Sequence, residues 1–295
     1  MAPTAPAEPA PADTDRDLFD RRRRATRRAR AVGPRGDWFG EQMSAMLLDR
    51  IEDVTRTFER VLVIGSRTPA LVDSLARLKA TAGAEVTIIE QSDALAATSG
   101  ATVGEEDRLP IEPESVDCIL WPGGLESVND VPGALLRCRL ALKGDGLLLG
   151  CFPGDGSFPA LRETLRIMDG EKAVARMHPQ IDTRAMGDLL SRIGLTMAVA
   201  DTEKLSLAYA ALPDLIADLR AATWTNLLKG PLHPVSKAEF AAACLGFASA
   251  GDAGGRTVEQ VRIVHYSGWA PHPDQPKPAR RGSATVSLKS ALKRD

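Results

Sequence analysis

The feature that most constrains the fold is a short apolar run that stops at a single glycine. Residues 59–64 read Glu-Arg-Val-Leu-Val-Ile, Gly65 follows, and apolar residues at helical spacing come next. A run of β-branched residues and leucine suits a buried parallel strand, and a glycine permits a tight turn into a helix. In such sheets a ligand binds outside the carboxyl ends of the strands, beside this first turn. The segment therefore predicts the opening of a nucleotide-binding α/β domain.

Further strand-like runs recur along the chain with helical patterns between them. The predicted strands are 84–90, 116–121, 146–152 and 258–266, with two shorter candidates at 197–200 and 205–208. Apolar residues three and four positions apart predict helices at 37–58, 132–143, 158–168, 186–193, 213–229 and 236–249. Strands that alternate with helices are typical of a parallel, doubly wound sheet. The last two helices form an insertion, at about 210–250, that we expect to cap the cleft before the last strand.

Composition narrows the class of protein. With 295 residues and 44% hydrophobic content, the chain can bury a full core, and a net charge of -2 argues against a protein that coats nucleic acid. The four cysteines form no CxxC pair and no Cys/His cluster, which predicts reduced structural thiols and no zinc site. No apolar stretch is long enough to span a membrane and no signal peptide is visible. We therefore expect a soluble, cytoplasmic protein.

The two ends of the chain have biased compositions. Residues 1–16 are rich in Ala, Pro and acidic residues, which predicts a disordered leader. Seven arginines then fall within residues 21–30. They indicate either a solvated, partly helical arm or a docking surface for an acidic partner or RNA, and the first interpretation is preferred. The Pro-rich and basic tail, 271–295, is expected to run extended over the surface.

Two residues at strand ends are candidates for binding a nucleotide. Glu90 ends the second strand, 25 residues after Gly65. A carboxylate there can accept hydrogen bonds from both ribose hydroxyls, although an ordinary strand-end acid facing water would have the same pattern. Trp121, at the end of the 116–121 strand, could face a bound nucleotide or pack in the core.

This order of elements resembles the class I S-adenosylmethionine-dependent methyltransferases, in particular the type 11 group. In that resemblance Gly65 falls on the first turn, Glu90 on the ribose acid and Glu105 on the acid near the adenine, while Asp117 precedes the fourth strand. The resemblance implies a seven-stranded, mostly parallel sheet over residues 59–270, preceded by a basic arm and an N-terminal helix at 17–58. It also implies S-adenosylmethionine as cofactor, with Gly65, Glu90 and Glu105 as binding residues, and Trp121 is added to them from its position at a strand end.

More particular segments resemble the respiratory complex I assembly factor 5 family. They are Leu18-Phe-Asp-Arg21, the stretch 179–194, Asp201-Thr-Glu-Lys-Leu205, Asp218-Leu-Arg220 with Asn226-Leu227, and Ser267-Gly-Trp-Ala-Pro-His-Pro273 through Gly282-Ser283. Together they cover most of residues 17–292. The resemblance implies a methyltransferase fold and a protein client, a subunit of complex I, and for the mitochondrial member an arginine-hydroxylating role.

The chain departs from the family pattern in two places. Where relatives have an acid before the first glycine and a second glycine after it, this chain has Ile64 before Gly65 and Ser-Arg-Thr-Pro at 66–69. Arg67 brings the wrong charge for the ammonium of the cofactor. The segment 125–130 also lacks the aromatic or His-Trp pair of the relatives. Two functions stay open: a methyltransferase acting on a protein partner, and a cofactor-free pseudoenzyme or assembly chaperone.

Catalytic residues are not evident in the sequence. Methyl transfer needs orientation and a desolvated pocket more than an acid or a base, so no catalytic residue is assigned. The histidines 178, 233, 265 and 272 form no HxxxH or HxH pair. A hydroxylase would need two histidines and a carboxylate converging on iron from distant segments, and this is a lesser alternative.

Overall fold

Seven strands of the described residues form one mixed sheet in the order β3-β2-β1-β4-β5-β7-β6. The computed structural model describes residues 16–31, 37–65, 69–172 and 174–276. The strands are β1 Arg60–Ile64, β2 Glu85–Glu90, β3 Thr102–Val103, β4 Val116–Pro122, β5 Leu142–Pro153, β6 Thr196–Tyr209 and β7 Thr257–Trp269. Neighbours from β3 to β5 pair in parallel, and β7 pairs antiparallel with both β5 and β6. The expected mostly parallel, seven-stranded sheet is therefore confirmed.

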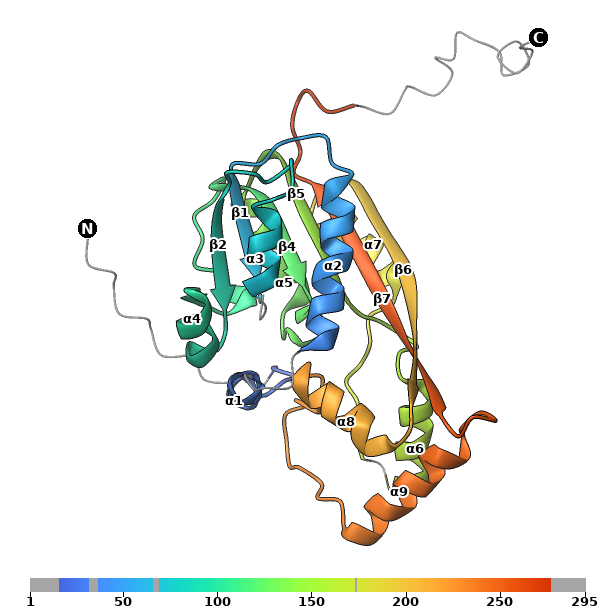
Figure 1. The fold of residues 1–295 in the computed structure, drawn as a ribbon. Helices are drawn as coiled ribbons and strands as arrows, with labels where there is room; N and C mark the ends of the chain where they lie inside the picture. Colours follow the sequence, from blue (N-terminus) through green and yellow to red (C-terminus); the bar gives the residue numbers. More distant parts are fainter. Residues whose placement is uncertain (1–15, 32–36, 66–68, 173, 277–295) are drawn as a thin grey trace, which may run out of the picture.

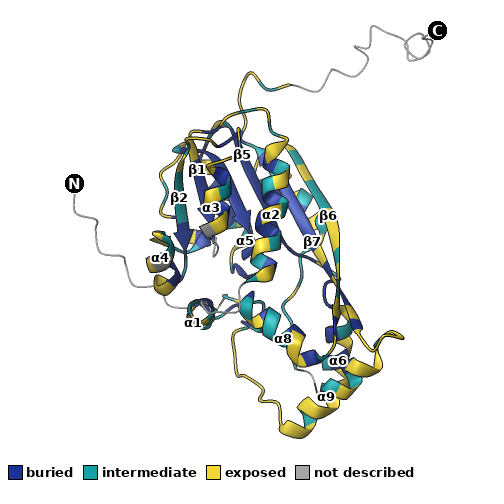
Figure 2. Ribbon diagram, in the orientation of Figure 1, coloured by how far each residue is buried: buried dark blue, intermediate teal, exposed yellow. Residues whose placement is uncertain are grey.

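Helices cover both faces of the sheet (Figure 1). The helices α2 Trp38–Glu52 and α3 Pro69–Leu75 pack on one face, and α5 Val131–Ala141 and α7 Thr183–Arg192 pack on the other. Successive side chains of β1 alternate between the two faces, so that Val61 and Val63 join one core while Leu62 and Ile64 join the other. All four are buried, as the dark central strands of Figure 2 show. This explains why β1 has a continuous apolar sequence.

The remaining helices lie toward one end of the molecule. There β6 and β7 run on beyond the other strands, beside α6 Pro159–Asp169, α8 Leu212–Ala221 and α9 Lys237–Ser249 (Figure 1). The helices α8 and α9 lie between β6 and β7 in the chain. The short helix α4 Asp93–Ser99 follows β2, and one-turn 3-10 helices, η1 Glu106–Arg108 and η2 Leu125–Ser127, lie in the loops beside β4.

Several predicted boundaries are wrong. The helix expected at 37–58 ends at Glu52, and the strand expected at 146–152 already begins at Leu142, within the helix expected at 132–143. The short strand β3 was not predicted. The two short strands expected at 197–200 and 205–208 are one strand, β6, because residues 201–204 keep pairing with residues 262–265 of β7. The helix expected at 213–229 ends at Ala221, and Thr223 then takes a left-handed conformation with φ +59°. Pairing with β7 decides the extent of β6, and the left-handed Thr223 follows the end of α8; local periodicity specifies neither.

Several predictions about the termini and the cysteines can be compared with the structure only in part. The leader and most of the tail lie outside the described residues. Cys118, Cys138, Cys151 and Cys244 are free thiols; the first three are buried, and burial raises their pKa. Among the described helices, none combines the length and apolar character that crossing a bilayer requires.

Candidate functional site

The carboxyl ends of β1, β2 and β4 form the edge where a cofactor would be expected. Gly65 follows β1 with φ +73°, and its N–H donates to the Ile89 carbonyl at 2.8 Å. A Cβ atom on Gly65 would lie 3.3 Å from Nη2 of Arg28. A glycine therefore suits this position for two reasons: it takes the positive φ without strain, and it leaves room for the Arg28 guanidinium. Residues 66–68 lie outside the described residues. The interpretation of Arg67 therefore stays a prediction.

Glu90, the expected ribose acid, is bound by an arginine of the same chain. It ends β2, and its buried carboxylate accepts from Arg28 at 2.7 Å (Nε to Oε1) and 2.8 Å (Nη2 to Oε2). The Arg28 side chain is 5% exposed and the Glu90 side chain 0%. This is the paired, charge-assisted geometry in which a guanidinium holds a carboxylate most firmly. Both oxygens that a ribose would need are therefore engaged.

Two more arginines of α1, which spans Arg21–Arg30, fill the rest of the edge. Arg24 donates to both oxygens of Glu106 at 2.8 and 2.9 Å, and also to the Gly124 carbonyl and the Ser127 hydroxyl. Arg21 donates to Asp107 at 2.6 and 2.9 Å and to Glu105 at 2.8 Å. Positions 21, 24 and 28 lie on one face of a helix, and here that face points inward although it is cationic.

The preferred interpretation of the basic segment as a solvated arm is therefore wrong for this face. Arg21, Arg24 and Arg28 are buried, whereas Arg22 and Arg30 are exposed. In Figure 1, α1 lies across the ends of the strands, beside α4 and α8. Burial of an arginine is tolerated when a carboxylate neutralises its charge, and each of these three has such a partner.

The chain preceding α1 is fastened on both sides. The buried Phe19 makes a β-bridge with Leu228, and its backbone N–H and carbonyl bond the side-chain amide of Asn129 at 2.8 and 3.0 Å. Asp20 caps the helix by accepting from the Arg23 N–H at 2.8 Å. These contacts fix the start of α1 between the β4 loop and the helical insertion.

Ion pairing raises the pKa of two inward arginines, Arg21 and Arg28, and so favours their charged forms. Burial opposes the charge of Arg28, but Glu90 outweighs it, so the pKa of Arg28 is raised. The hydrogen bond to Asp107 is the largest cause that raises the pKa of Arg21. Burial, followed by the charge of Glu106, raises the pKa of Glu105. The guanidinium groups of Arg21 and Arg28 therefore stay charged and bound to their carboxylates near neutral pH.

Among the described residues of this edge, the two pockets beside the arginines of α1 are small. A pocket of about 10 Å³ remains beside Arg21 and Arg24, and another of about 10 Å³ lies between Arg28 and Gly65. Sites for ligands of drug size have volumes of roughly 300–1,000 Å³. The residues of this edge therefore do not fit S-adenosylmethionine while α1 is in this position.

The structure brings three of the four expected cofactor residues together. Gly65, Glu90 and Glu105 all lie at the edge and all approach arginines of α1. Trp121 is fully buried among core side chains, which corresponds to the packing alternative for this residue. Their role in cofactor binding stays a prediction. One sequence signal could have indicated that α1 fills this edge. The arginines at 21, 24 and 28 have the three- and four-residue spacing of side chains on one helix face, which is the spacing that buried residues of a helix usually show.

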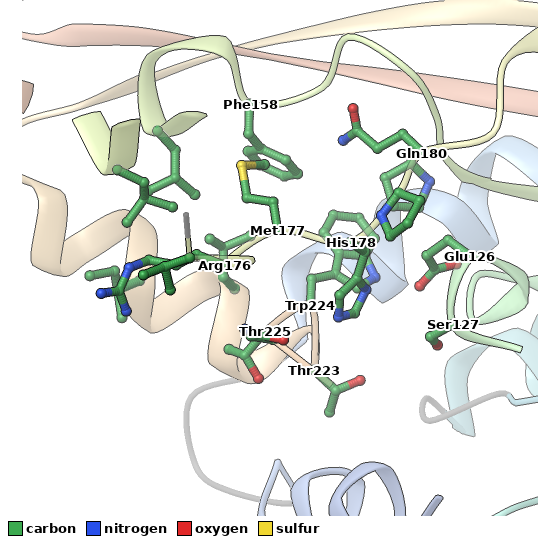
Figure 3. Close-up of a pocket in the computed structure, with 18 of the residues that line it drawn as sticks. Glu126, Ser127, Phe158, Arg176, Met177, His178, Gln180, Thr223, Trp224 and Thr225 are labelled. Carbon is green, nitrogen blue, oxygen red and sulfur yellow. The ribbon is translucent and has the colours of Figure 1, made fainter. Parts of the chain in front are cut away.

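A larger, apolar pocket lies beside this edge. It measures about 300 Å³ and is lined mainly by apolar side chains from α6, α8 and the loops near residues 174–180 and 223–233. Figure 3 shows Phe158, Met177, His178 and Trp224 around it, with Glu126 and Ser127 on the side of the β4 loop. The smaller pocket by Gly65 shares Glu126, Ser127, Thr223 and Trp224 with it. The apolar pocket therefore adjoins the edge that α1 fills.

Burial shifts the pKa of two ionisable groups in the lining of the apolar pocket, His178 and Glu126, toward their neutral forms. Burial, followed by the positive charges of Arg24 and Arg27, lowers the pKa of His178 to about 4. Its Nε2 accepts from the Leu227 N–H at 2.8 Å. Burial raises the pKa of Glu126. Within the described part of the chain, no group of three or more His, Cys, Asp or Glu side chains is arranged to hold a metal ion.

Comparisons with known proteins define the relatives of this chain. No family model matches it. It is 26% identical over 263 residues to "Arginine-hydroxylase NDUFAF5, mitochondrial" of Danio rerio, covering 85% of this chain and 81% of the relative. The Homo sapiens protein of the same name is 27% identical over 287 residues, covering 93% and 81%. A malonyl-[acyl-carrier protein] O-methyltransferase of Coxiella burnetii is 27% identical over 201 residues, covering 68% of this chain and 70% of its own.

Solved structures resemble the fold at low sequence identity. The YcgJ protein of Bacillus subtilis superposes with a TM-score of 0.54 at 12% identity, covering 79% of this chain and 99% of its own. A protein assigned as a methyltransferase from Bacillus halodurans gives a TM-score of 0.52 at 10% identity, covering 78% and 99%. The predicted resemblance is confirmed: the chain has the class I, Rossmann-like methyltransferase fold and is related in sequence to proteins named "Arginine-hydroxylase NDUFAF5, mitochondrial".

Proposed function

We propose that this protein is a methyltransferase-like assembly protein that binds a protein partner, a subunit of respiratory complex I, and that it does so without S-adenosylmethionine. The assembly role is supported by the relatives named NDUFAF5 and by the resemblance in the C-terminal segments. The observation that carries the cofactor-free part is the insertion of Arg21, Arg24 and Arg28 into the edge where the cofactor would lie. Cytoplasmic location stays a prediction, because these relatives are named as mitochondrial.

The cost of admitting the cofactor gives this proposal its physical basis. A ribose at Glu90 would have to displace Arg28 from a pair in which both side chains are at most 5% exposed. Breaking a buried pair by removing one partner costs about 3–5 kcal/mol. A penalty of that size weakens binding by about 10²- to 10³-fold or more, since each 1.4 kcal/mol is tenfold. To make room for the cofactor, Arg24 would also have to leave its ion pair with Glu106.

A second candidate is a methyltransferase whose site opens only when α1 leaves. It is favoured by the retention of Gly65, Glu90 and Glu105 at the edge and by the adjoining apolar pocket. In this candidate α1 acts as a plug that a partner removes. The hydroxylase alternative is favoured by the name of these relatives, "Arginine-hydroxylase NDUFAF5, mitochondrial". No arrangement of the described residues adds support for it.

Calorimetric titration with S-adenosylmethionine separates the first two candidates. We expect the full chain to show no binding at millimolar ligand. The variant Arg24→Gln/Arg28→Gln removes two of the three charges that fill the edge, and Arg22→Gln/Arg184→Gln removes two exposed charges as a matched control. Binding by the wild type with micromolar affinity would overturn the cofactor-free proposal. Binding gained only by Arg24→Gln/Arg28→Gln would favour the plugged methyltransferase.

The assembly role needs a separate experiment. Deletion of the gene in its native cells should lower the amount of assembled complex I, as measured on native gels, and the wild-type gene should restore it. Normal complex I in the deletion strain would rule out the assembly role, whatever the titration shows.

A further inference from the structure

The outward side of α1 borders a second concave region. It is a pocket of about 460 Å³ between the last turns of α1 and α8, lined by Arg27, Arg30, Ala31, Ile216, Arg220, Thr225 and Asn226. The inward arginines, 21, 24 and 28, lie elsewhere on the helix and take no part in lining it. This pocket is therefore separate from the edge described above.

The arginines of this pocket lack the carboxylate partners that the inward arginines have. Among the ion pairs of the described residues, none involves Arg27, Arg30 or Arg220. Arg27 is held by the Thr225 hydroxyl at 2.7 Å and by the Asn226 carbonyl, both of them uncharged. Burial lowers the pKa of Arg27, and the positive charges of Arg23, Arg220 and Arg30 lower it further, while the charge of Asp20 opposes this shift without reversing it. Like charges thus converge on one concavity, which an anion would relieve.

Stabilisation of the helix ends explains only part of this arrangement. Arg30 and Arg220 lie in the last turns of α1 and α8, where a cation interacts favourably with the helix dipole. Such an interaction needs one exposed cation on each helix. It does not account for three arginines meeting around one hollow with Thr225 and Asn226.

The geometry also indicates which kind of anion fits. Compact phosphate sites are typically built from backbone N–H groups at the start of a helix. Here both helices present their C-terminal ends, so the charged donors are side chains alone. Ile216 and Ala31 add an apolar wall. Guanidinium groups bind carboxylates and phosphates alike, so the apolar wall is the feature that favours a peptide bearing carboxylates and apolar side chains over a compact phosphate.

We propose that this pocket is a docking site for an acidic segment of the protein partner, with carboxylates bound by Arg27, Arg30 and Arg220. The proposal rests on the proposed function in assuming a protein partner. Guanidinium groups bind carboxylates through paired hydrogen bonds, and concentrated positive charge speeds association with an acidic surface. The inward arginines of α1 then hold the helix in place, while the outward ones receive the partner.

Fluorescence anisotropy of a labelled peptide of alternating glutamate and leucine, added to the full chain, tests the docking site. The variant Arg30→Gln/Arg220→Gln removes two exposed charges of the pocket, and Arg22→Gln/Arg184→Gln removes two exposed charges elsewhere. We expect the pocket variant to bind the peptide at least about tenfold more weakly, and the control to stay within about twofold of the wild type. Binding should also weaken steeply as NaCl rises.

Three results would overturn the proposal. One is the absence of peptide binding by the wild type at low salt, and another is an equal loss of affinity in both variants. The third is displacement of the peptide by inorganic pyrophosphate at equal concentration, which would indicate a site for compact anions. None of these results changes the outcome of the gene deletion or of the cofactor titration, so failure here is distinguishable from failure of the proposed function.

Discussion

Replacement of Arg28 by leucine tests whether α1 is part of the folded core. The change removes the cation that faces the fully buried Glu90 carboxylate. Removing one partner of a buried pair costs about 3–5 kcal/mol of unfolding free energy. Glu90 keeps a hydrogen bond from the Gln91 N–H at 2.9 Å, so we expect about 3 kcal/mol, at the lower end. Larger domains lose about 2–4 °C in Tm for each kcal/mol, which gives a drop of about 10 °C.

A double variant that replaces both Arg28 and Glu90 tests whether the loss comes from this ion pair. In Arg28→Leu/Glu90→Leu neither charge is left unpaired, and replacement of a buried pair by apolar residues is often neutral. The double variant should therefore unfold within about 1–2 kcal/mol of the wild type, with a coupling energy of at least about 2 kcal/mol. Urea unfolding followed by circular dichroism measures all four proteins of the cycle. A single variant that loses less than about 1 kcal/mol, with additive effects in the double, would refute the buried pair.

Three further predictions concern the same region. The His178 imidazole has a pKa of about 4 in the folded protein, against an ordinary 6.5. Its neutral form therefore stabilises the fold fully above pH 6.5, and this contribution is lost as pH falls toward 4. Between pH 7 and pH 5 the unfolding free energy of the wild type, measured in urea, should fall by about 2 kcal/mol more than that of His178→Gln. Equal losses would contradict the buried, neutral histidine. Gly65→Ala should cost about 1–2 kcal/mol in the same assay, because φ is +73° and Nη2 of Arg28 lies 3.3 Å from the new Cβ, and an unchanged midpoint would show that the turn is less constrained. Arg24→Ser should cost at least about 3 kcal/mol and Arg22→Ser less than about 0.5 kcal/mol, in thermal or urea unfolding, because only Arg24 is buried against a carboxylate; similar losses would mean that α1 is solvated on all sides.

Much of the architecture could be predicted because its signals are local. The apolar run before Gly65 alternates between two cores that lie on opposite faces of one strand, so its sequence indicates burial on both sides. The position of Glu90 at the end of the next strand follows from the length of that run and from the turn before it. These features depend on backbone geometry within a few residues, which the order of side chains largely specifies.

The environment of the arginines could not be predicted in the same way. By composition, residues 21–30 are a solvated basic helix, because isolated arginines are rarely buried. Their partners Glu90, Glu106 and Asp107 lie 62, 82 and 86 residues further along the chain. Whether such a charge is buried depends on a carboxylate brought to it by the sheet topology, and not on its neighbours in sequence.

The sequence by itself determined β1, β2, β4, β5 and β7, most of the helices and the edge at which a nucleotide would bind, since apolar periodicity and one glycine specify them locally. Only the tertiary structure decided that this edge is filled from within the chain. Parallel pairing places the ends of β1, β2 and β4 side by side, and the carboxylates beside them then receive the guanidinium groups of α1. The spacing of the arginines marks one helix face, but their carboxylate partners have no local signature, because the pairing is set by distance in space.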